Sequence, residues 1–401
     1  MKHLMHTELE SLNKSEEKLL TPCFVVRTSK FDALLRSITD AAQCTFENYI
    51  LGYSLKTNNL PWIIRHVKEK GFWAEVVSSD EYRLAKNMGF EPKNIIFNGP
   101  VKGKKEYIEA VEKGAVVNID SHRELEWLLE CKQDLLFNAK LGVRVNFCIE
   151  EICPGESQCG SDDGRFGFSY ENGELKKVID FFKTHCIPLR GLHLHCSSKT
   201  RSLNIYKAIA KITVQLVNEY DLKLDYVDVG GGFFGGMEGK PRFEDYFNSM
   251  KEIFLKTAAL KDTSIIIEPG ISVVGASVDY VMDVIDVKST KNNTFVVTDG
   301  SRIHVDPLMR KCSYSYRIES NTGYGDEVVK QILCGFTCME NDRFFKIESA
   351  PLVTGDRVII EKVGAYTMGL SPQFIEGYPV VYAEQEGRYI VIRKKRELPI
   401  E

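Results

Sequence analysis

The sequence predicts an α/β fold: a (β/α)8 TIM barrel with a C-terminal, mostly β domain. Through the first two thirds of the chain, short apolar runs alternate with stretches of helical spacing. Eight such runs fall within roughly 240 residues, the number and size expected of a barrel. After Gly270 the helical spacing fades, and strand-like runs separated by turn residues replace it.

Each predicted barrel strand is a short apolar run. In order, they cover residues 49–55, 73–77, 94–97, 115–119, 140–147, 189–195, 226–229 and 264–268. Helical spacing lies between most of them, at 60–70, 80–88, 104–113, 122–131, 174–183, 203–220 and 243–260. An open doubly wound sheet is the alternative. The barrel is preferred because the candidate functional residues follow many different strands, and a closed barrel gathers such residues at one mouth.

The sequence pattern of the C-terminal part predicts a mostly β domain. Its predicted strands are 294–298, 327–333, 357–363, 379–382 and 389–393. Residues 21–26 have the same pattern, and we expect them to join this sheet. The predicted domains are therefore residues 28–270 for the barrel, and 1–27 with 271–401 for the β domain.

Composition indicates a globular, cytoplasmic protein. The chain is 43% hydrophobic and 27% charged, with a net charge of −4, which gives no reason to expect nucleic acid or an anionic membrane as a partner. The 11 cysteines form no CxxC pair, and the N-terminus has no apolar signal stretch. The spacing of Cys148, Cys153 and Cys159 fits no zinc pattern, so no metal site is predicted.

Two features of the barrel suggest a cofactor site. Lys56 ends the first apolar run, and partial burial at a strand end lowers the pKa of a lysine and frees its amine to attack a carbonyl. Gly230, Gly231 and Gly232 follow the seventh strand, where such barrels often bind phosphate through backbone N–H groups. Read separately, each has a plain structural explanation, a solvated lysine or a flexible turn.

Further strand ends carry residues that suit a pyridine ring. Glu268 ends the eighth strand, and a carboxylate there could keep a ring nitrogen protonated. His195 ends the sixth strand and could stack on a planar ring, while the hydroxyl of Ser198 could bind phosphate. His193 lies deeper on the same strand face and is expected to be structural.

Two residues of the β domain complete the set. The Cys338 thiol lies in a predicted loop and could act as an acid at the substrate Cα. Tyr366 offers a phenol that could reach a phosphate. Together with Lys56, Glu268 and His195, these residues are the parts of a pyridoxal-phosphate site.

With these residues assembled, the chain resembles the fold type III, or alanine-racemase-fold, pyridoxal-phosphate decarboxylases. This family includes diaminopimelate, ornithine, arginine and carboxynorspermidine decarboxylases. The resemblance runs from Thr21 to Phe374. It rests on the motifs Tyr53-Ser54-Leu55-Lys56-Thr57-Asn58, Glu75-Val76-Val77-Ser78-Ser79-Asp80-Glu81, Arg165-Phe166-Gly167, Leu194-His195-Cys196-Ser197-Ser198, Asp228-Val229-Gly230-Gly231-Gly232-Phe233, Glu268-Pro269-Gly270, Thr337-Cys338 and Gly364-Ala365-Tyr366.

The resemblance implies an amino-acid decarboxylase and a role for each residue. Lys56 forms the Schiff base with the cofactor, Glu268 pairs with the pyridinium, and His195 stacks on the ring. Cys338 supplies a proton after carbon dioxide leaves. The phosphate is held by Ser198, Gly231, Gly232 and Tyr366. The resemblance also implies a homodimer in which Cys338 reaches the partner's site.

This chain departs from the family where the substrate is recognised. Ile271 stands where the family commonly has an arginine after Glu-Pro-Gly, and Met339 stands where an acidic residue often follows the cysteine, with Glu340 one place later. The family's Phe-Asn near the C-terminus is here Phe374-Ile375.

A basic cluster follows Asp299-Gly300, where the family reads the substrate side chain. The cluster consists of Arg302, His304, Arg310 and Lys311. It predicts a substrate with an acidic or conjugated side chain, because arginine binds carboxylates well. Three alternatives remain open: a diaminopimelate decarboxylase, a racemase of the same fold, and a non-catalytic cofactor-binding homologue.

Overall fold

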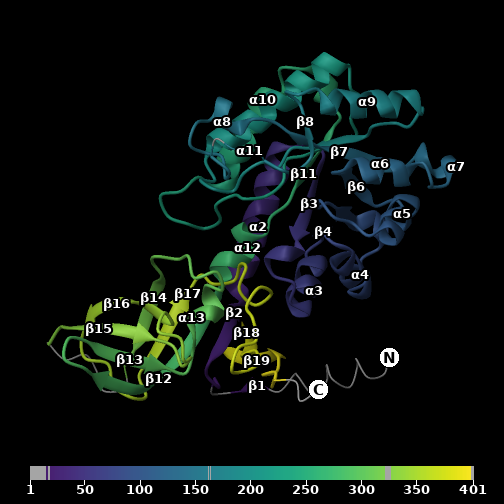
Figure 1. The fold of residues 1–401 in the computed structure, drawn as a ribbon. Helices are drawn as coiled ribbons and strands as arrows, with labels where there is room; N and C mark the ends of the chain where they lie inside the picture. Colours follow the sequence, from purple (N-terminus) through teal and green to yellow (C-terminus); the bar gives the residue numbers. More distant parts are fainter. Residues whose placement is uncertain (1–14, 17–18, 161, 163, 321–326, 399–401) are drawn as a thin grey trace. The chain divides into compact units, whose positions relative to one another are not determined.

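The computed structural model describes residues 15–16, 19–160, 162, 164–320 and 327–398 (Figure 1). These residues form two compact units. One is Leu34–Ser272, and the other combines the described residues up to Ala33 with those from Val273 onward. No helix among the described residues combines the length and the apolar character that a membrane crossing demands.

The unit Leu34–Ser272 is a closed barrel of eight parallel strands. They are β3 (Tyr49–Ser54), β4 (Trp73–Val76), β5 (Ile95–Phe97), β6 (Val116–Ile119), β7 (Lys140–Asn146), β9 (Gly191–His193), β10 (Tyr226–Asp228) and β11 (Ser264–Ile267). The ring closes because β11 pairs with β3 and β6 pairs with β7. A two-residue strand, β8 (Phe168–Ser169), adds to β7. The predicted barrel is confirmed, and every predicted strand is present.

Helices follow most of these strands. They are α2 (Thr28–Thr45), α3 (Pro61–Glu69), α4 (Ser79–Asn87), α5 (Lys104–Glu112), α6 (His122–Leu128), α7 (Gln133–Leu136), α8 (Ile149–Ile152), α9 (Glu174–Thr184), α10 (Leu203–Tyr220), α11 (Phe243–Phe254) and α12 (Ile271–Val274). Short 3-10 turns lie at η1 (Leu55–Thr57), η2 (Pro92–Asn94), η3 (Ala258–Leu260) and η4 (Gly275–Ser277). Local sequence sets several starts: Pro61 opens α3, and the Ser78 side chain accepts a hydrogen bond from the Glu81 N–H at α4.

One tyrosine helps to fill the barrel interior. Tyr226 packs with Ile96, Val116 and Ile266 in a buried cluster, and its hydroxyl donates to Asn118 Oδ1 at 2.8 Å. A Cβ atom on Gly191 would lie 2.2 Å from the Tyr226 ring. Glycine at this strand position therefore makes room for the ring.

The second unit is built on a large mixed sheet. Its strands are β1 (Ser15–Glu16), β2 (Cys23–Arg27), β12 (Val278–Ser289), β13 (Thr294–Thr298), β14 (Ser315–Glu319), β15 (Val329–Cys334), β16 (Arg343–Ser349), β17 (Arg357–Glu361), β18 (Val380–Gln385) and β19 (Arg388–Arg393), with one short helix, α13 (Arg302–Val305). The main strand order is β1-β19-β18-β2-β12-β13-β15-β16, and β17 pairs with β12 and β14.

The N-terminal segment joins this sheet as the sequence predicted. Strand β2 pairs with β12 in antiparallel fashion and with β18 in parallel. Cys23 and Val25 of β2 pack on Val281, Ile359 and other residues in a buried cluster. Four strands of this unit, β1, β12, β14 and β16, were not predicted.

Candidate active site

Polar side chains gather at the carboxyl ends of the barrel strands, where barrel enzymes place their functional groups. Each of the eight strands contributes one such residue in the strand or directly after it. The residues are Ser54, Glu75, Asn98, Asn118, Arg144, His193, Asp228 and Glu268. Arg144 is slightly exposed, and the other seven are buried.

Lys56 is held beside a buried carboxylate. It lies in η1, directly after β3, and its Nζ lies 2.8 Å from Glu75 Oε2 and 2.9 Å from Ser54 Oγ. The Ser54 hydroxyl in turn donates to the same Glu75 oxygen. The Lys56 side chain is 41% exposed, whereas that of Glu75 is 1% exposed. The amine is thus fixed in direction but still reachable by a ligand.

Two asparagine side chains connect the buried carboxyl groups. The Asn98 amide donates to Glu75 Oε1 at 3.1 Å and also to Glu268 Oε1. The Asn118 amide donates to Asn98 Oδ1 at 2.8 Å and to Asp228 Oδ2 at 3.0 Å. The network therefore runs without a break from the end of β3 to the end of β11.

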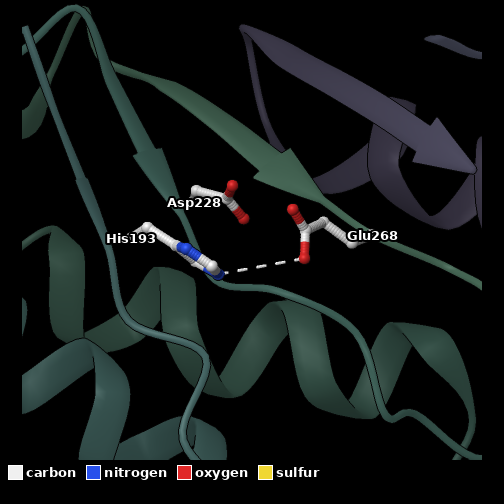
Figure 2. Close-up of side chains that lie close together, drawn as sticks. All are labelled: His193, Asp228 and Glu268. Atoms are coloured by element: carbon white, nitrogen blue, oxygen red, sulfur yellow. Dashed lines mark ion pairs between the residues drawn. The ribbon is translucent and has the colours of Figure 1, made fainter. Parts of the chain in front are cut away.

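The pair Asp228 and Glu268 retains a proton at neutral pH. Burial raises the pKa of Asp228 to about 7. Burial, and then the charge of Asp228, raise the pKa of Glu268 well above its ordinary range. Figure 2 shows these two side chains with His193, all three pointing toward one another. A protonated carboxyl at this place can give a proton to a ring nitrogen and then hold the resulting cation.

The glycine run forms a narrow loop against Ser198. Gly232 has a φ of +92°, in the left-handed region that favours glycine, and a Cβ atom there would lie 2.5 Å from Ser198 Oγ. The Gly230 N–H donates to Asp228 Oδ1 at 2.9 Å, and the Tyr206 hydroxyl donates to the Gly231 carbonyl at 2.8 Å. This loop, with the Ser198 hydroxyl beside it, fits a phosphate group.

His195 is a neutral ring in this site. Burial, and then the positive charges of Arg144 and Lys56, lower the pKa of its imidazole to about 3. The Arg144 guanidinium donates to the His195 carbonyl at 3.3 Å, which fixes the backbone of this residue. A neutral imidazole is suited to stacking on a flat ring and not to proton donation.

Sequence reasoning missed the residue that anchors the loop after β9. The Ser197 hydroxyl donates to the Glu156 carbonyl at 2.7 Å, and the Thr200 hydroxyl donates to the Glu156 carboxylate at 2.9 Å. The Ser202 hydroxyl donates to the same carboxylate. Glu156 therefore holds the loop that carries Ser198. Its sequence position, between two cysteines and far from any strand end, gives no signal of this role.

The predicted residues of the β unit lie in two loops. Cys338 is exposed, between β15 and β16, and the hydroxyl and N–H of the preceding Thr337 both donate to Asp342. Tyr366 follows β17, is 44% exposed and has a φ of +56°. Within their own unit, both side chains are accessible.

The packing of Arg302 and His304 does not support their predicted contact with substrate. The Arg302 guanidinium donates twice to Asp306, at 2.8 and 3.1 Å. His304 is buried, with Nδ1 2.6 Å from the Tyr280 hydroxyl. Both side chains are therefore committed within the β unit. These partners are not evident from the sequence, and a role of either residue in substrate binding stays a prediction.

The other candidate substrate residues differ in exposure and in whether their charged groups already have a partner. Arg310 is exposed, and its guanidinium has no partner among the described residues. Lys311 Nζ donates to the Val305 carbonyl at 2.9 Å. The Glu340 carboxylate is 95% exposed and pairs with Arg343 at 2.7 Å. Met339 is half-buried.

We expect His304 to make the protein less stable in acid. Burial lowers the pKa of its imidazole to about 4; the charge of Asp342 opposes this shift, and the charge of Arg393 adds a smaller lowering effect. Between pH 4 and about 6.5 the unfolded chain binds a proton that the folded chain does not, so stability falls as the pH falls through this window. The advantage of the wild type over His304→Phe in thermal midpoint should therefore shrink from pH 7 to pH 4.5. A difference that does not change with pH would contradict this assignment.

Taken together, an accessible lysine amine, a narrow glycine loop beside a serine hydroxyl and a buried carboxyl at one barrel mouth fit the cofactor of a pyridoxal-phosphate enzyme. The chain belongs to the family described as "Pyridoxal-dependent decarboxylase, pyridoxal binding domain", which matches residues 32–275, more than half of its length. The protein is thus a decarboxylase that uses pyridoxal phosphate. This confirms the family, the cofactor and the enzyme class predicted from the sequence.

Individual relatives agree with this assignment. The chain is 29% identical over 362 residues to "Probable diaminopimelate decarboxylase, chloroplastic" of Oryza sativa subsp. japonica, covering 86% of this chain and 72% of that protein. It is 26% identical over 429 residues to "L-glutamyl-[BtrI acyl-carrier protein] decarboxylase" of Niallia circulans, covering 98% and 95%. The solved structure of diaminopimelate decarboxylase from M. jannaschii with L-lysine has the same fold, with a TM-score of 0.82, 22% identity, and coverage of 94% and 89%.

Proposed function

We propose that this decarboxylase acts on an amino acid or amino-acid conjugate whose far end is acidic or conjugated, and not on ornithine or lysine. The observation that carries the proposal is the state of the candidate substrate residues. Ile271 is apolar and half-buried, and the Glu340 carboxylate is already paired with Arg343. Arg310 has an exposed guanidinium without a partner among the described residues.

Physical chemistry favours an anionic group over an ammonium here. An ammonium removed from water without a paired carboxylate loses several kcal/mol of hydration. A guanidinium, in contrast, binds a carboxylate or phosphate through two parallel hydrogen bonds. Of the four basic residues in the predicted cluster, Arg310 is the one we assign to such a group.

One relative lends support to a conjugated substrate. The name of the Niallia circulans protein describes a glutamyl group attached to an acyl-carrier protein. The substrate named there is an amino acid joined to a larger carrier, so decarboxylation of conjugates occurs among proteins similar to this chain along nearly its whole length.

Diaminopimelate is the second candidate substrate. Most of the compared relatives carry the name diaminopimelate decarboxylase. Diaminopimelate has a second carboxylate at its far end, which Arg310 could also bind. Met339 argues against it, because it stands where an acidic residue often follows the cysteine and offers no charge to pair with the second amino group.

The residue roles we propose follow from the barrel site. When bound, pyridoxal phosphate supplies an electron-poor ring that takes up the electron pair left as carbon dioxide departs. Lys56 holds the cofactor covalently, and Glu75 keeps its amine oriented. Glu268 would provide the acid and then the counter-charge for the ring nitrogen, and the neutral His195 would lie against the ring without exchanging protons.

The remaining roles complete the proposed site. Ser198, Gly231, Gly232 and Tyr366 bind the phosphate, and residues 28–270 form the cofactor-binding domain. Cys338 donates a proton to Cα in the site of the partner subunit, so the working unit is a homodimer. We also propose a cytoplasmic location, since all eleven cysteines are free in the structure.

A kinetic panel tests the substrate. It compares ornithine, lysine, arginine, meso-diaminopimelate, glutamate and carboxylated conjugates by carbon dioxide release. For an acidic or conjugated substrate, Arg310→Gln should raise KM about 10- to 100-fold with little change in kcat, because it removes binding and not chemistry. Arg388→Gln is the matched control, an exposed arginine of the same unit.

The panel also gives results that contradict the proposal. If ornithine or lysine is preferred about tenfold in kcat/KM, roughly 1.4 kcal/mol, the pocket argument is wrong and Glu340 binds the far amine. If Arg310→Gln and Arg388→Gln behave alike, Arg310 does not read the substrate.

A further inference from the structure

His193 is a buried imidazole that finds no hydrogen-bond partner in the part of the chain that the structure describes. It lies in β9, two residues before His195, and its side chain is only 3% exposed. Neither ring nitrogen has a hydrogen-bond partner among the described residues. Its Nε2 points at Glu268 Oε2 across 3.9 Å, which is too long for a hydrogen bond (Figure 2).

A buried polar ring without partners costs free energy, and an apolar ring could fill the same space. Two acidic side chains beside His193 are the candidates for its hydrogen-bond partner. One ring nitrogen of His193 and one carboxylate oxygen each of Asp228 and Glu268 all lie within 4.8 Å of one another. No other group among the described residues brings a histidine and two acids together in this way.

The imidazole is neutral, so one of its nitrogens carries a proton to donate. Burial is the main cause that lowers the pKa of His193 well below its ordinary range. The positive charges of Arg144, Lys56 and Lys102 act in the same direction, as does His195 when protonated. His193 therefore cannot serve as the counter-ion of a carboxylate, but it can offer an N–H.

Among the acids, Glu268 is the one left to accept. Both oxygens of Asp228 already accept hydrogen bonds, from the Asn118 amide and from the Gly230 N–H. Glu268 Oε1 accepts from Asn98. Burial, and then the charge of Asp228, raise the pKa of Glu268 and so favour its protonated form. Once Glu268 loses that proton, its carboxylate is negatively charged, and Oε2 needs a hydrogen-bond donor.

We propose that His193 is a positioning residue that acts through Glu268: its Nε2–H donates to Glu268 Oε2 when that carboxyl has passed its proton to the ring nitrogen of the bound cofactor. The step moves one proton from oxygen to nitrogen and needs no other reactant. The 3.9 Å separation then closes to hydrogen-bond length. The inference rests on the proposed placement of the ring nitrogen against Glu268.

The test uses the loaded protein and cofactor labelled with 15N in its ring. The 15N chemical shift reports directly whether the ring nitrogen is protonated. In His193→Phe, which keeps a flat buried ring, the pH at which this nitrogen loses its proton should fall by about one unit, tenfold in the protonation equilibrium. His193→Gln, which retains an amide N–H, should recover part of the shift. The thermal midpoint of cofactor-free His193→Phe should not fall, because no hydrogen bond is removed.

Two controls distinguish the role of His193 from the placement of the ring nitrogen against Glu268. Wild-type behaviour of the 15N signal in His193→Phe means that His193 only fills space, and the inference is wrong. If Glu268→Gln also leaves the signal unchanged, the proposed placement of the ring nitrogen fails instead.

A measurement on the wild type covers the case of a variant that does not fold. With 15N-labelled histidine, the His193 N–H signal should move to the position of a hydrogen-bonded proton when the cofactor binds. An identical His193 signal in cofactor-free and loaded protein would overturn the inference.

Discussion

Lys56→Ala should abolish covalent attachment of the cofactor and slow decarboxylation by about 10⁴-fold, since the positioned amine is lost. The fold should persist. The Glu75 carboxylate keeps two donors, the Ser54 hydroxyl and the Asn98 amide, after the lysine amine is removed. The measurement is borohydride reduction of the loaded wild type followed by peptide mapping, together with the loss of the yellow colour in the variant.

A second lysine supplies a matched control. Lys104 is 47% exposed and pairs with Glu130 at 2.7 Å, much as Lys56 is 41% exposed and pairs with Glu75. Lys104→Ala should therefore leave colour and rate unchanged. A reduced cofactor found on any lysine other than Lys56 would refute the assignment.

Lys56→Ala, combined with Cys338→Ala, also tests whether the two subunits of a dimer share their active sites. Cys338→Ala alone should release carbon dioxide but give misprotonated products, because the acid at Cα is missing. Mixing it with Lys56→Ala should restore up to about a quarter of wild-type activity through mixed dimers with one intact site. No recovery, in protein shown to exchange subunits, would place both residues in one chain's site.

Glu268→Gln should lower the decarboxylation rate about 10²- to 10³-fold, the loss expected when one electrostatic stabiliser is removed. The amide cannot donate a proton to the ring nitrogen or balance its charge. It can still accept the hydrogen bond from Asn98. Single-turnover kinetics measure the effect, with Glu126→Gln, an exposed glutamate on α6, as the control.

Stability gives an independent check on this variant. Burial raises the pKa of Glu268, so the folded chain holds a proton that the unfolded chain releases. Its contribution to stability is therefore present at low pH and is lost as the pH rises above the ordinary glutamate range. Cofactor-free Glu268→Gln should match the wild type near pH 5 and exceed it in thermal midpoint at pH 8. In the kinetic experiment, near-normal turnover of Glu268→Gln would show that protonation of the ring nitrogen does not drive the reaction.

Local sequence predicted the barrel well because its parallel strands are buried on both faces. Such strands read as continuous apolar runs, and the ends of these runs mark the positions of Lys56, His195 and Glu268. The link through Asn98 and Asn118 was missed. An asparagine after a strand has no special meaning until the ring closes and brings β5 and β6 opposite β10 and β11.

Strand β12 was missed for a different reason. Its twelve residues include Asp279 and Asp283, which are unusual in a strand. In the folded sheet, Asp279 pairs with Arg27 of β2 at 2.9 Å, and Asp283 pairs with Arg357 of β17 at 2.7 Å. The partners lie more than 70 residues away, so pattern reasoning could not compensate for the charges.

The hydrogen-bonded amides at the barrel mouth have a consequence for how such an enzyme changes over time. Exchanging Asn98 or Asn118 alters several carboxyl groups at once, so effects of paired substitutions there should be strongly non-additive. Arg310 and Met339 lie outside that network, in the other unit. If Arg310 and Met339 bind the substrate as proposed, substitutions that change substrate choice should leave the barrel network intact. Substitutions within that network should succeed only when several of its residues change together.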